Sequence, residues 1–197
     1  MNQKISGIYA ITPNKILDID LIEQAIITHK ISILQYRHKR QTAVQTDKIT
    51  DASIKINEAK QLQQLCLRHN TLFIINDDIN LAQKINADGV HLGKEDDTIQ
   101  TARQILGADA IIGVSCYNDI KLAEHAQNQG ANYVAFGALF PSRTKPNAPS
   151  CPLNTITRAK QQLSIPIVGI GGINFDNQQQ AFDAGCDAVA MINALSK

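Results

Sequence analysis

Short apolar runs separated by amphipathic stretches recur along the whole chain. Eight runs have the length and composition of strands, at residues 7–12, 31–37, 72–76, 89–93, 110–115, 133–139, 165–172 and 188–193. Most intervening stretches show helical periodicity, as in the apolar positions Ala59, Leu62, Leu65 and Cys66. The pattern predicts eight β/α repeats.

The predicted strands are apolar on both faces, which is typical of a parallel sheet covered by helices. Eight repeats favour a closed (β/α)8 TIM barrel over an open doubly wound sheet, and the G-x-G-x-x-G turn of a dinucleotide-binding sheet is missing after the first strand. Only ALSK follows the last run, so we expect an abbreviated last helix. With 197 residues, 44% of them hydrophobic, the chain is expected to form one α/β domain over residues 1–197.

Three segments repeat one pattern, in which a helix ends, a tight turn follows and a Val-centred strand begins. They start at Lys84, Asn128 and Asp183. Asn86, Gly130 and Gly185 suit the left-handed position that terminates a helix, and we expect them there.

The charge balance gives no support to a nucleic-acid or membrane partner. The formal net charge is +1, from 19 basic and 18 acidic residues, so an anionic ligand must be held locally. No signal-type segment or membrane-length apolar run is present, and the chain is expected to be cytoplasmic. The widely spaced Cys66, Cys116, Cys151 and Cys186 are interpreted as reduced thiols.

Polar side chains cluster where the second, third and fourth strands end, the edge at which a β/α barrel carries its chemistry. Gln35, Arg37 and Lys39 alternate and so share one face, although a solvated strand end would explain them too. Asn76 and Asp77 follow the third strand, and Asp78 suits a helix N-cap.

The loop after the fourth strand adds Glu95, Asp96 and Asp97. Helix capping would explain each acidic residue separately. Their convergence with cations such as Lys145 around one cavity instead suggests Mg²⁺ bridged by phosphate oxygens.

Later strand ends offer groups that bind anions. Ser115 ends the fifth strand, and the proline-rich loop 140–152 after the sixth carries Ser142, Thr144 and Lys145. The backbone N–H groups of residues 171, 172, 192 and 193 are placed where barrels commonly hold a phosphate, although the glycines also suit a tight turn. His91 is interpreted as a packed, hydrogen-bonded residue, and the other histidines, among them His38, are expected at the surface.

Together, the segments QYRHK, INDD, ADGVHLGKED, GVS, FGALFPSRTKP and VGIGGI resemble the thiamine phosphate synthase family, nearly end to end. The resemblance implies a transferase that joins hydroxymethylpyrimidine diphosphate to a thiazole phosphate, with diphosphate leaving by a dissociative, Mg²⁺-assisted route. The GVSCY segment of this chain differs from the GVS-x-H form of many family members, which leaves the roles of Cys116 and Tyr117 open.

The resemblance also assigns roles by motif position. The residues implied to hold the diphosphate are Arg37, Lys39, Asn76, Ser115 and Lys145. All of these except Asn76 are also the implied catalytic residues. Gln35 is implied to lie near the pyrimidine. Those implied to carry Mg²⁺ are Asp77 and Asp96. Those implied to hold the thiazole phosphate are Ser142, Thr144, Gly172, Ile192 and Asn193.

Two other functions stay open at this point. A thiazole tautomerase resembles the synthase in fold but has no need for Arg37, Lys39, Asp77 and Asp96 together. A thiamine phosphate sensor without activity is the second alternative. In each case the partners are small molecules, and the sequence does not give the oligomeric state.

Overall fold

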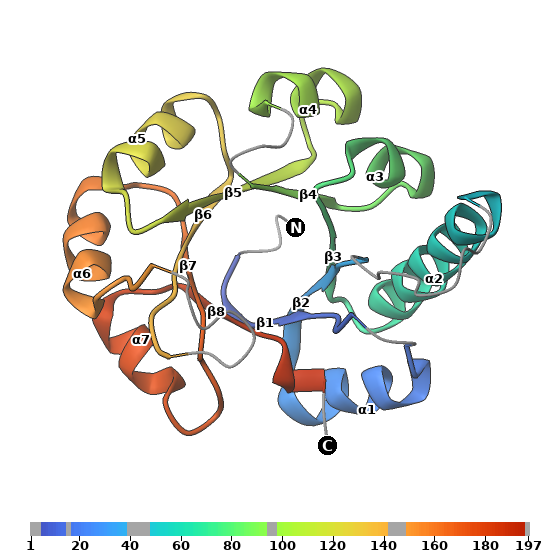
Figure 1. Cartoon of the computed structure of the whole chain (residues 1–197), viewed down its shortest axis with the longest axis horizontal. Helices are drawn as coiled ribbons and strands as arrows, with labels where there is room; N and C mark the ends of the chain where they lie inside the picture. The colour runs from blue at the N-terminus through green and yellow to red at the C-terminus, as the bar shows by residue number, and fades with distance from the viewer. Residues whose placement is uncertain (1–4, 15–16, 39–47, 94–97, 142–148, 196–197) are drawn as a thin grey trace.

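Eight parallel strands close into a barrel in the order β1 to β8, with helices around its outside (Figure 1). The computed structural model describes residues 5–14, 17–38, 48–93, 98–141 and 149–195, without the side chains of 48–51. The strands are β1 (Gly7–Ile11), β2 (Ile31–Tyr36), β3 (Leu72–Asn76), β4 (Gly89–Leu92), β5 (Ile111–Tyr117), β6 (Tyr133–Phe136), β7 (Ile167–Ile170) and β8 (Ala188–Met191). The helices are α1 (Ile19–His29), α2 (Lys48–Arg68), α3 (Ile79–Ile85), α4 (Ile99–Leu106), α5 (Ile120–Asn128), α6 (Leu153–Gln162), α7 (Gln178–Ala184) and the 3₁₀ helix η1 (Asn193–Leu195). The predicted strands and the TIM-barrel fold class are confirmed.

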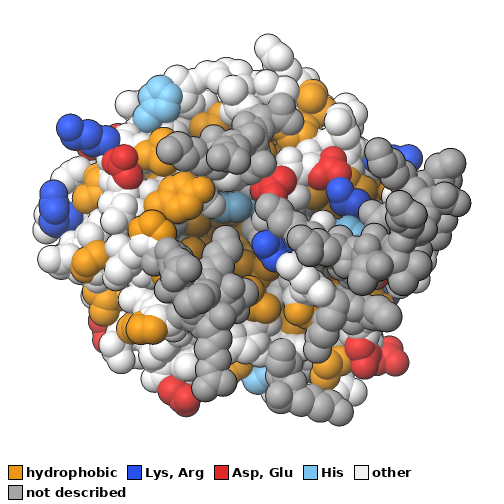
Figure 2. All heavy atoms as spheres, viewed as in Figure 1, with side chains coloured by type: hydrophobic (Ala, Val, Ile, Leu, Met, Phe, Trp, Pro, Cys, Tyr) orange, Lys and Arg blue, Asp and Glu red, His pale blue; other side chains and the backbone are white. Residues whose placement is uncertain are grey.

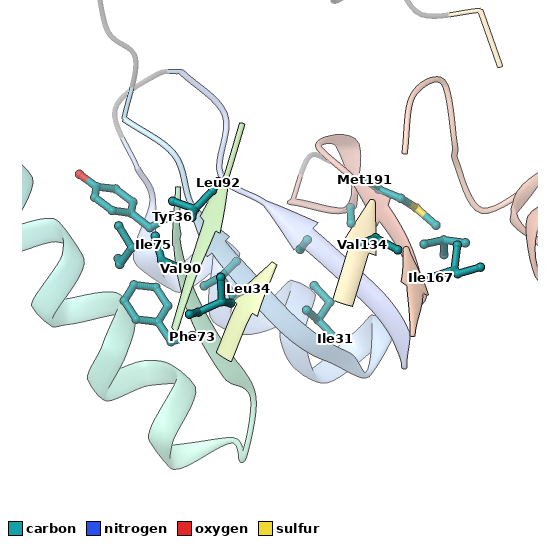
Figure 3. Close-up of a cluster of buried hydrophobic side chains, with 14 of the residues drawn as sticks. Ile31, Leu34, Tyr36, Phe73, Ile75, Val90, Leu92, Val134, Ile167 and Met191 are labelled. Carbon is teal, nitrogen blue, oxygen red and sulfur yellow. The ribbon is translucent and has the colours of Figure 1, made fainter. Parts of the chain in front are cut away.

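The outward face of each strand packs against the helices. Leu34 and Tyr36 of β2, Phe73 and Ile75 of β3, and Val90 of β4 belong to one continuous apolar layer (Figure 3). Burying a side chain of this size contributes on the order of 2 kcal/mol relative to leaving it in water. This layer therefore fixes the helices around the barrel.

The inward face of each strand builds a second, smaller core inside the barrel. Ile33, Ile74 and Val168 belong to it, at positions that alternate with the outward residues. Ile5, which precedes β1, packs into the same cluster, so the amino-terminal end of the barrel is filled. The open space lies at the other end.

Local signals in the sequence set the helix ends as predicted. Asn86, Gly130 and Gly185 have φ values of 54°, 92° and 117°, in the left-handed region. The Asp78 carboxylate caps α3 by accepting from the Leu81 backbone N–H at 2.8 Å. These turns place each following strand in the barrel.

The last strand is followed by η1 in place of a full helix, as far as the described residues reach. Ala194 and Leu195 of η1 are buried, so this short segment covers the barrel beside α1. Among the described helices, none is long and apolar enough to cross a membrane.

Asp78 stabilises the barrel in two ways, and substitutions separate them. Its carboxylate also pairs with Lys55 Nζ at 2.6 Å. Asp78→Ala should lower the free energy of unfolding by about 1–2 kcal/mol through loss of the cap and the ion pair, whereas Asp78→Asn keeps a capping oxygen and should lose less. Chemical denaturation measures both.

The matched control is Asp119, which caps α5 through Leu122 N–H at 3.1 Å and pairs with no described cation. Asp119→Ala should lower the free energy of unfolding by about 1 kcal/mol, and Asp119→Asn should leave it almost unchanged.

Burial tends to raise the pKa of Asp78, but the hydrogen bonds from Lys55 and Leu81 outweigh it and hold this pKa below its usual value. The contribution of Asp78 should therefore be present at neutral pH and be lost as the pH falls through that lowered pKa. If Asp78→Asn and Asp119→Asn lowered the free energy of unfolding equally, the ion pair between Asp78 and Lys55 would add nothing to stability.

Candidate functional site

A cavity of about 340 Å³ opens at the carboxyl ends of the strands. Each strand contributes to its wall, through Ile11, Gln35, Asn76, His91, Ser115, Ala135, Ile170 and Ala190 in chain order. On the face shown in Figure 2, acidic and basic side chains lie side by side near one edge of the central hollow, and apolar side chains are visible on its other side. The cavity therefore has a charged side and an apolar side.

A chain of hydrogen bonds crosses the barrel interior beneath this cavity. Gln35 Nε2 donates to the Tyr9 hydroxyl at 2.8 Å, and the Tyr9 and Tyr133 hydroxyls lie 2.8 Å apart. The Tyr133 hydroxyl contacts His91 Nδ1 at 3.0 Å, and His91 Nε2 contacts Ser115 Oγ at 2.8 Å. The chain thus connects β2 with β5 and gives each of these buried polar groups a partner.

Burial keeps this chain uncharged. It lowers the pKa of His91 to about 4, although the nearby Asp77 carboxylate works in the opposite direction. Burial also raises the pKa of both Tyr9 and Tyr133 above the usual tyrosine value. At neutral pH the imidazole and both phenols are therefore neutral.

The end of β3 places Asn76 and Asp77 at the charged side. Asp77 has a φ of 64°, an unusual conformation for a residue other than glycine, and its N–H donates to the His91 carbonyl at 2.9 Å. Asn76 lines the main cavity and also, with Asp77, a smaller pocket of about 230 Å³ beside it. Strain of this kind is often found at functional sites, and here it holds a carboxylate next to the cavity.

Arg37 follows β2 and lines the same cavity. Its backbone N–H donates to Thr12 Oγ1 at 2.8 Å, and its Nη1 donates to Asn14 Oδ1 at 3.0 Å. The loop after β1 therefore orients this guanidinium, whose remaining donors are suited to an anion. As predicted, Gln35 and Arg37 share one face.

The end of β5 divides its side chains between the cavity and the core. Ser115 and Tyr117 line the cavity, whereas Cys116 is fully buried in the outer apolar layer. Tyr117 has a φ of 57° and lies at a register shift between β5 and β6. Two alternate side chains of this segment therefore face the cavity.

The loops after β7 and β8 form the opposite wall. Gly171 and Ile192 line the cavity. Gly172 has a φ of 65°, and a β-carbon there would overlap the Phe140 and Pro141 carbonyl oxygens. Its lack of a side chain therefore permits close packing with the loop after β6, and the phosphate-binding role of Gly172 and of the exposed Asn193 stays a prediction.

Several predicted site residues lie outside the described residues. They are Lys39, Asp96, Ser142, Thr144 and Lys145. Their assigned roles stay predictions. The structure brings together Gln35, Arg37, Asn76, Ser115 and Ile192 around the cavity, with Asp77 beside it.

Sequence reasoning missed Tyr9 and Tyr133 and misplaced one histidine. A tyrosine inside an otherwise apolar strand needs a partner for its hydroxyl, and that signal was available for both residues. His91 is hydrogen-bonded as predicted, but the expected surface position of His38 is wrong: its side chain is only 5% exposed, beside Glu58 and Tyr36. The polar groups of that cluster satisfy one another away from solvent.

Comparison with known sequences identifies a family and several relatives. Residues 8–195 match the model of a family described as thiamine monophosphate synthase. A thiamine-phosphate synthase from Chromobacterium violaceum is 46% identical over 99% of this chain and 90% of that protein. Another from Methylobacillus flagellatus is 47% identical over 97% of this chain and 88% of that protein.

Solved structures agree on the fold. A thiamine phosphate pyrophosphorylase from Pyrococcus furiosus aligns with a TM-score of 0.79 at 29% identity, over 95% of this chain and 85% of that one. The structure described as native KDPGal aligns with a TM-score of 0.67 at 16% identity, over 97% and 84% of the two chains, and shares the fold alone.

The four buried thiols should be inert in the native protein. Burial raises the pKa of Cys116 and Cys186 to about 12 and that of Cys151 to about 11, and it also raises the pKa of Cys66. At pH 8 we expect slow reaction with Ellman's reagent under native conditions and rapid reaction of all four thiols in denaturant. Fast native labelling of Cys116 would contradict its place in the core beside Ser115.

Proposed function

Because the chain belongs to the thiamine monophosphate synthase family, it catalyses the synthesis of thiamine phosphate, and we propose that the cavity at the strand ends carries out this reaction. The substrates would be hydroxymethylpyrimidine diphosphate and a thiazole phosphate. The bond from the pyrimidine methylene carbon to the diphosphate oxygen breaks, and a bond from that carbon to the thiazole nitrogen forms. The placement rests on one observation: Arg37, Asn76 and Ser115 lie together at one side of the cavity, facing the loops after β7 and β8.

We place the diphosphate against that polar wall. The Arg37 guanidinium, the Asn76 amide and the Ser115 hydroxyl offer donors from three different strand ends. Lys39 and Lys145, outside the described residues, are proposed to complete this set. The pyrimidine ring then lies toward Gln35, whose side chain is buried at the base of the same wall.

A Mg²⁺ ion fits the donors next to this wall. Among the described residues no group of three metal-ligating side chains occurs, so Asp77 has to be joined by other oxygens. Asp96 is the proposed second carboxylate, since it follows β4, which pairs with β3 next to Asp77. Mg²⁺ is commonly bound through one or two carboxylates plus substrate phosphates, and it would neutralise charge on the leaving diphosphate.

Among the residues that the structure describes, none in the cavity is an activated nucleophile, which favours a dissociative route. Ser115 contacts His91, but this imidazole is a weak base because burial holds its pKa near 4 and its other nitrogen faces the Tyr133 hydroxyl instead of a carboxylate. We therefore propose that the protein acts by positioning and charge stabilisation. Departure of the diphosphate leaves a cation stabilised by the electron-rich pyrimidine, and the thiazole nitrogen captures it.

The apolar side of the cavity suits this cation. Ala135, Val168 and Ala190 form a small-residue floor without charged groups. Such a surface excludes water, which would otherwise compete with the thiazole for the cation. The thiazole phosphate is proposed to bind on the wall of Gly171 and Ile192, where backbone N–H groups suit a phosphate.

The tautomerase and sensor alternatives have less support. Relatives at 46% and 47% identity are thiamine-phosphate synthases, and the polar wall provides for a diphosphate that a tautomerase does not handle. The direct test is turnover: purified protein should form thiamine phosphate from both substrates in the presence of Mg²⁺. Binding of thiamine phosphate without turnover would favour a sensor.

The metal assignment is tested by two neighbouring aspartates. Asp77→Asn should lower kcat by about 10²-fold, because a carboxylate that holds Mg²⁺ at the leaving group is lost. Asp78→Asn, which keeps the α3 cap, should retain most of the activity and serves as the matched control. Near wild-type rates for Asp77→Asn at limiting Mg²⁺ would remove Asp77 from the metal site.

The two-wall arrangement predicts selective defects. Arg37→Ala should weaken binding of the pyrimidine diphosphate by about 1.5–3 kcal/mol through loss of a charge-assisted hydrogen bond, with little effect on the thiazole phosphate. Michaelis constants for both substrates check this, together with binding measurements, because the two quantities agree only when chemistry is slow. Equal defects for both substrates would contradict separate walls.

A further inference from the structure

The donors and acceptors of the buried hydrogen-bond chain indicate where each of its protons lies. Gln35 Nε2 donates to the Tyr9 oxygen, so the Tyr9 proton must point to its other partner, the Tyr133 oxygen. Tyr9 is 1% exposed, and among the described residues no other acceptor contacts its hydroxyl. With the Gln35 amide in this orientation, both hydrogen bonds of the Tyr9 hydroxyl have a defined direction.

The remaining protons of the chain follow from the same constraint. Tyr133 already accepts from Tyr9, so its own proton goes to His91 Nδ1. The imidazole proton then sits on Nε2 and points to Ser115 Oγ. Ser115 receives a hydrogen bond from inside the barrel, and its own hydroxyl proton is left for the cavity.

Other arrangements are less favourable. An imidazolium at His91 would donate at both nitrogens, which would force the Tyr133 proton onto Tyr9 and leave the Tyr9 proton without an acceptor. A fully reversed chain would require Gln35 to present its oxygen to Tyr9. Ser115 would then give its proton to His91 and offer only lone pairs to the cavity, which is unfavourable for an anion.

We infer that Gln35, Tyr9, Tyr133, His91 and Ser115 form one hydrogen-bond chain of a single polarity, which makes Ser115 a donor to the substrate diphosphate and Gln35 Oε1 an acceptor facing the cavity. The inference rests on the proposed function for the identity of the anion. Tyr9, Tyr133 and His91 act in it as positioning residues. An acceptor at Gln35 matches an amino group on the pyrimidine, so the chain links recognition at one end of that substrate to recognition at the other.

A glycine in β5 shows that the chain is built into the fold. A β-carbon at Gly113 would overlap the ring and hydroxyl of Tyr133. Only glycine at this position lets the ring lie across β5 and reach both Tyr9 and His91. The chain therefore depends on a residue that contributes no polar atom.

The first test reads the position of the His91 proton directly. Long-range ¹H–¹⁵N spectra of histidine-labelled protein distinguish the two neutral tautomers, and His91 is assigned by loss of its signals in a His91→Gln variant. The wild-type protein should show the Nε2–H tautomer. An Nδ1–H tautomer, a mixture of the two or an imidazolium at neutral pH would overturn the inference. The measurement is made on the wild-type protein, and only the assignment uses a variant.

A reversing substitution tests whether the chain acts as one unit. Gln35→Glu, studied at a pH where the new carboxylate is ionised, offers only acceptors to Tyr9. It should reverse each hydrogen bond in turn and move the His91 proton to Nδ1. Adding Tyr133→Phe removes the middle oxygen, so the double variant should return to Nε2–H. No change in the single variant, or the same change in both variants, would contradict transmission through Tyr133.

Diphosphate binding supplies the functional test. Isothermal titration with inorganic diphosphate and Mg²⁺ should show affinity about tenfold weaker for Gln35→Glu, because Ser115 becomes an acceptor. The double variant should recover most of this loss although it keeps the added carboxylate. A double variant as weak as the single one would assign the loss to charge repulsion and overturn the donor role of Ser115.

A control variant loses a buried hydroxyl elsewhere. Thr71→Val removes the hydrogen bond from Thr71 Oγ1 to the Ile31 carbonyl, 3.0 Å long and at the other end of the barrel, and should bind diphosphate as the wild type does. If the wild type bound no diphosphate, the proposed diphosphate site and the donor role of Ser115 would both fail. The tautomer pattern would still decide the polarity of the chain by itself.

Discussion

Pairing between β1 and β8 closes the sheet, and the site depends on that closure. Tyr9 pairs with Ala190 and Ala10 with Met191, so the first and last strands lie side by side. The carboxyl ends of all strands then meet at one rim, which brings residues as distant in sequence as Gln35 and Ile192 to one cavity. An open sheet made of the same strands would leave these side chains along an extended edge.

Closure also creates a narrow interior that has to be filled. Apolar residues such as Ile33 and Ile74 fill the lower part, and Ala135 and Ala190 leave room above them. The polar side chains between these levels are acceptable inside the barrel because each has a hydrogen-bond partner. The packing of the barrel and the chemistry of the cavity therefore use the same residues.

Sequence patterns predicted the architecture because each local signal had a direct physical cause. The strands were recognised as short apolar runs, and the ends of helices at Asn86 and Gly185 followed from their tolerance of the left-handed region. The cap of α3 by Asp78 was also predicted and is confirmed. At the second strand, alternation correctly placed Gln35 and Arg37 on one face.

The interior chain was not predicted because apolar runs do not reveal which residues point inward. Tyr9 and Tyr133 were treated as members of apolar strands, and their meeting depends on closure and on Gly113, not on any local motif. His38 was misplaced for a similar reason, since its partner Glu58 comes from α2. The Mg²⁺ ion, the roles of Lys39 and Lys145 and the cytoplasmic location stay predictions.

The proposed function depends on one polar wall of the barrel cavity, which we expect to bind the diphosphate. A crystal structure of the protein with Mg²⁺ and inorganic diphosphate tests this most directly. We expect the diphosphate oxygens within hydrogen-bonding distance of Arg37, Asn76 and Ser115, with the metal beside Asp77. Diphosphate bound on the wall of Gly171 and Ile192, or away from the cavity, would contradict the claim.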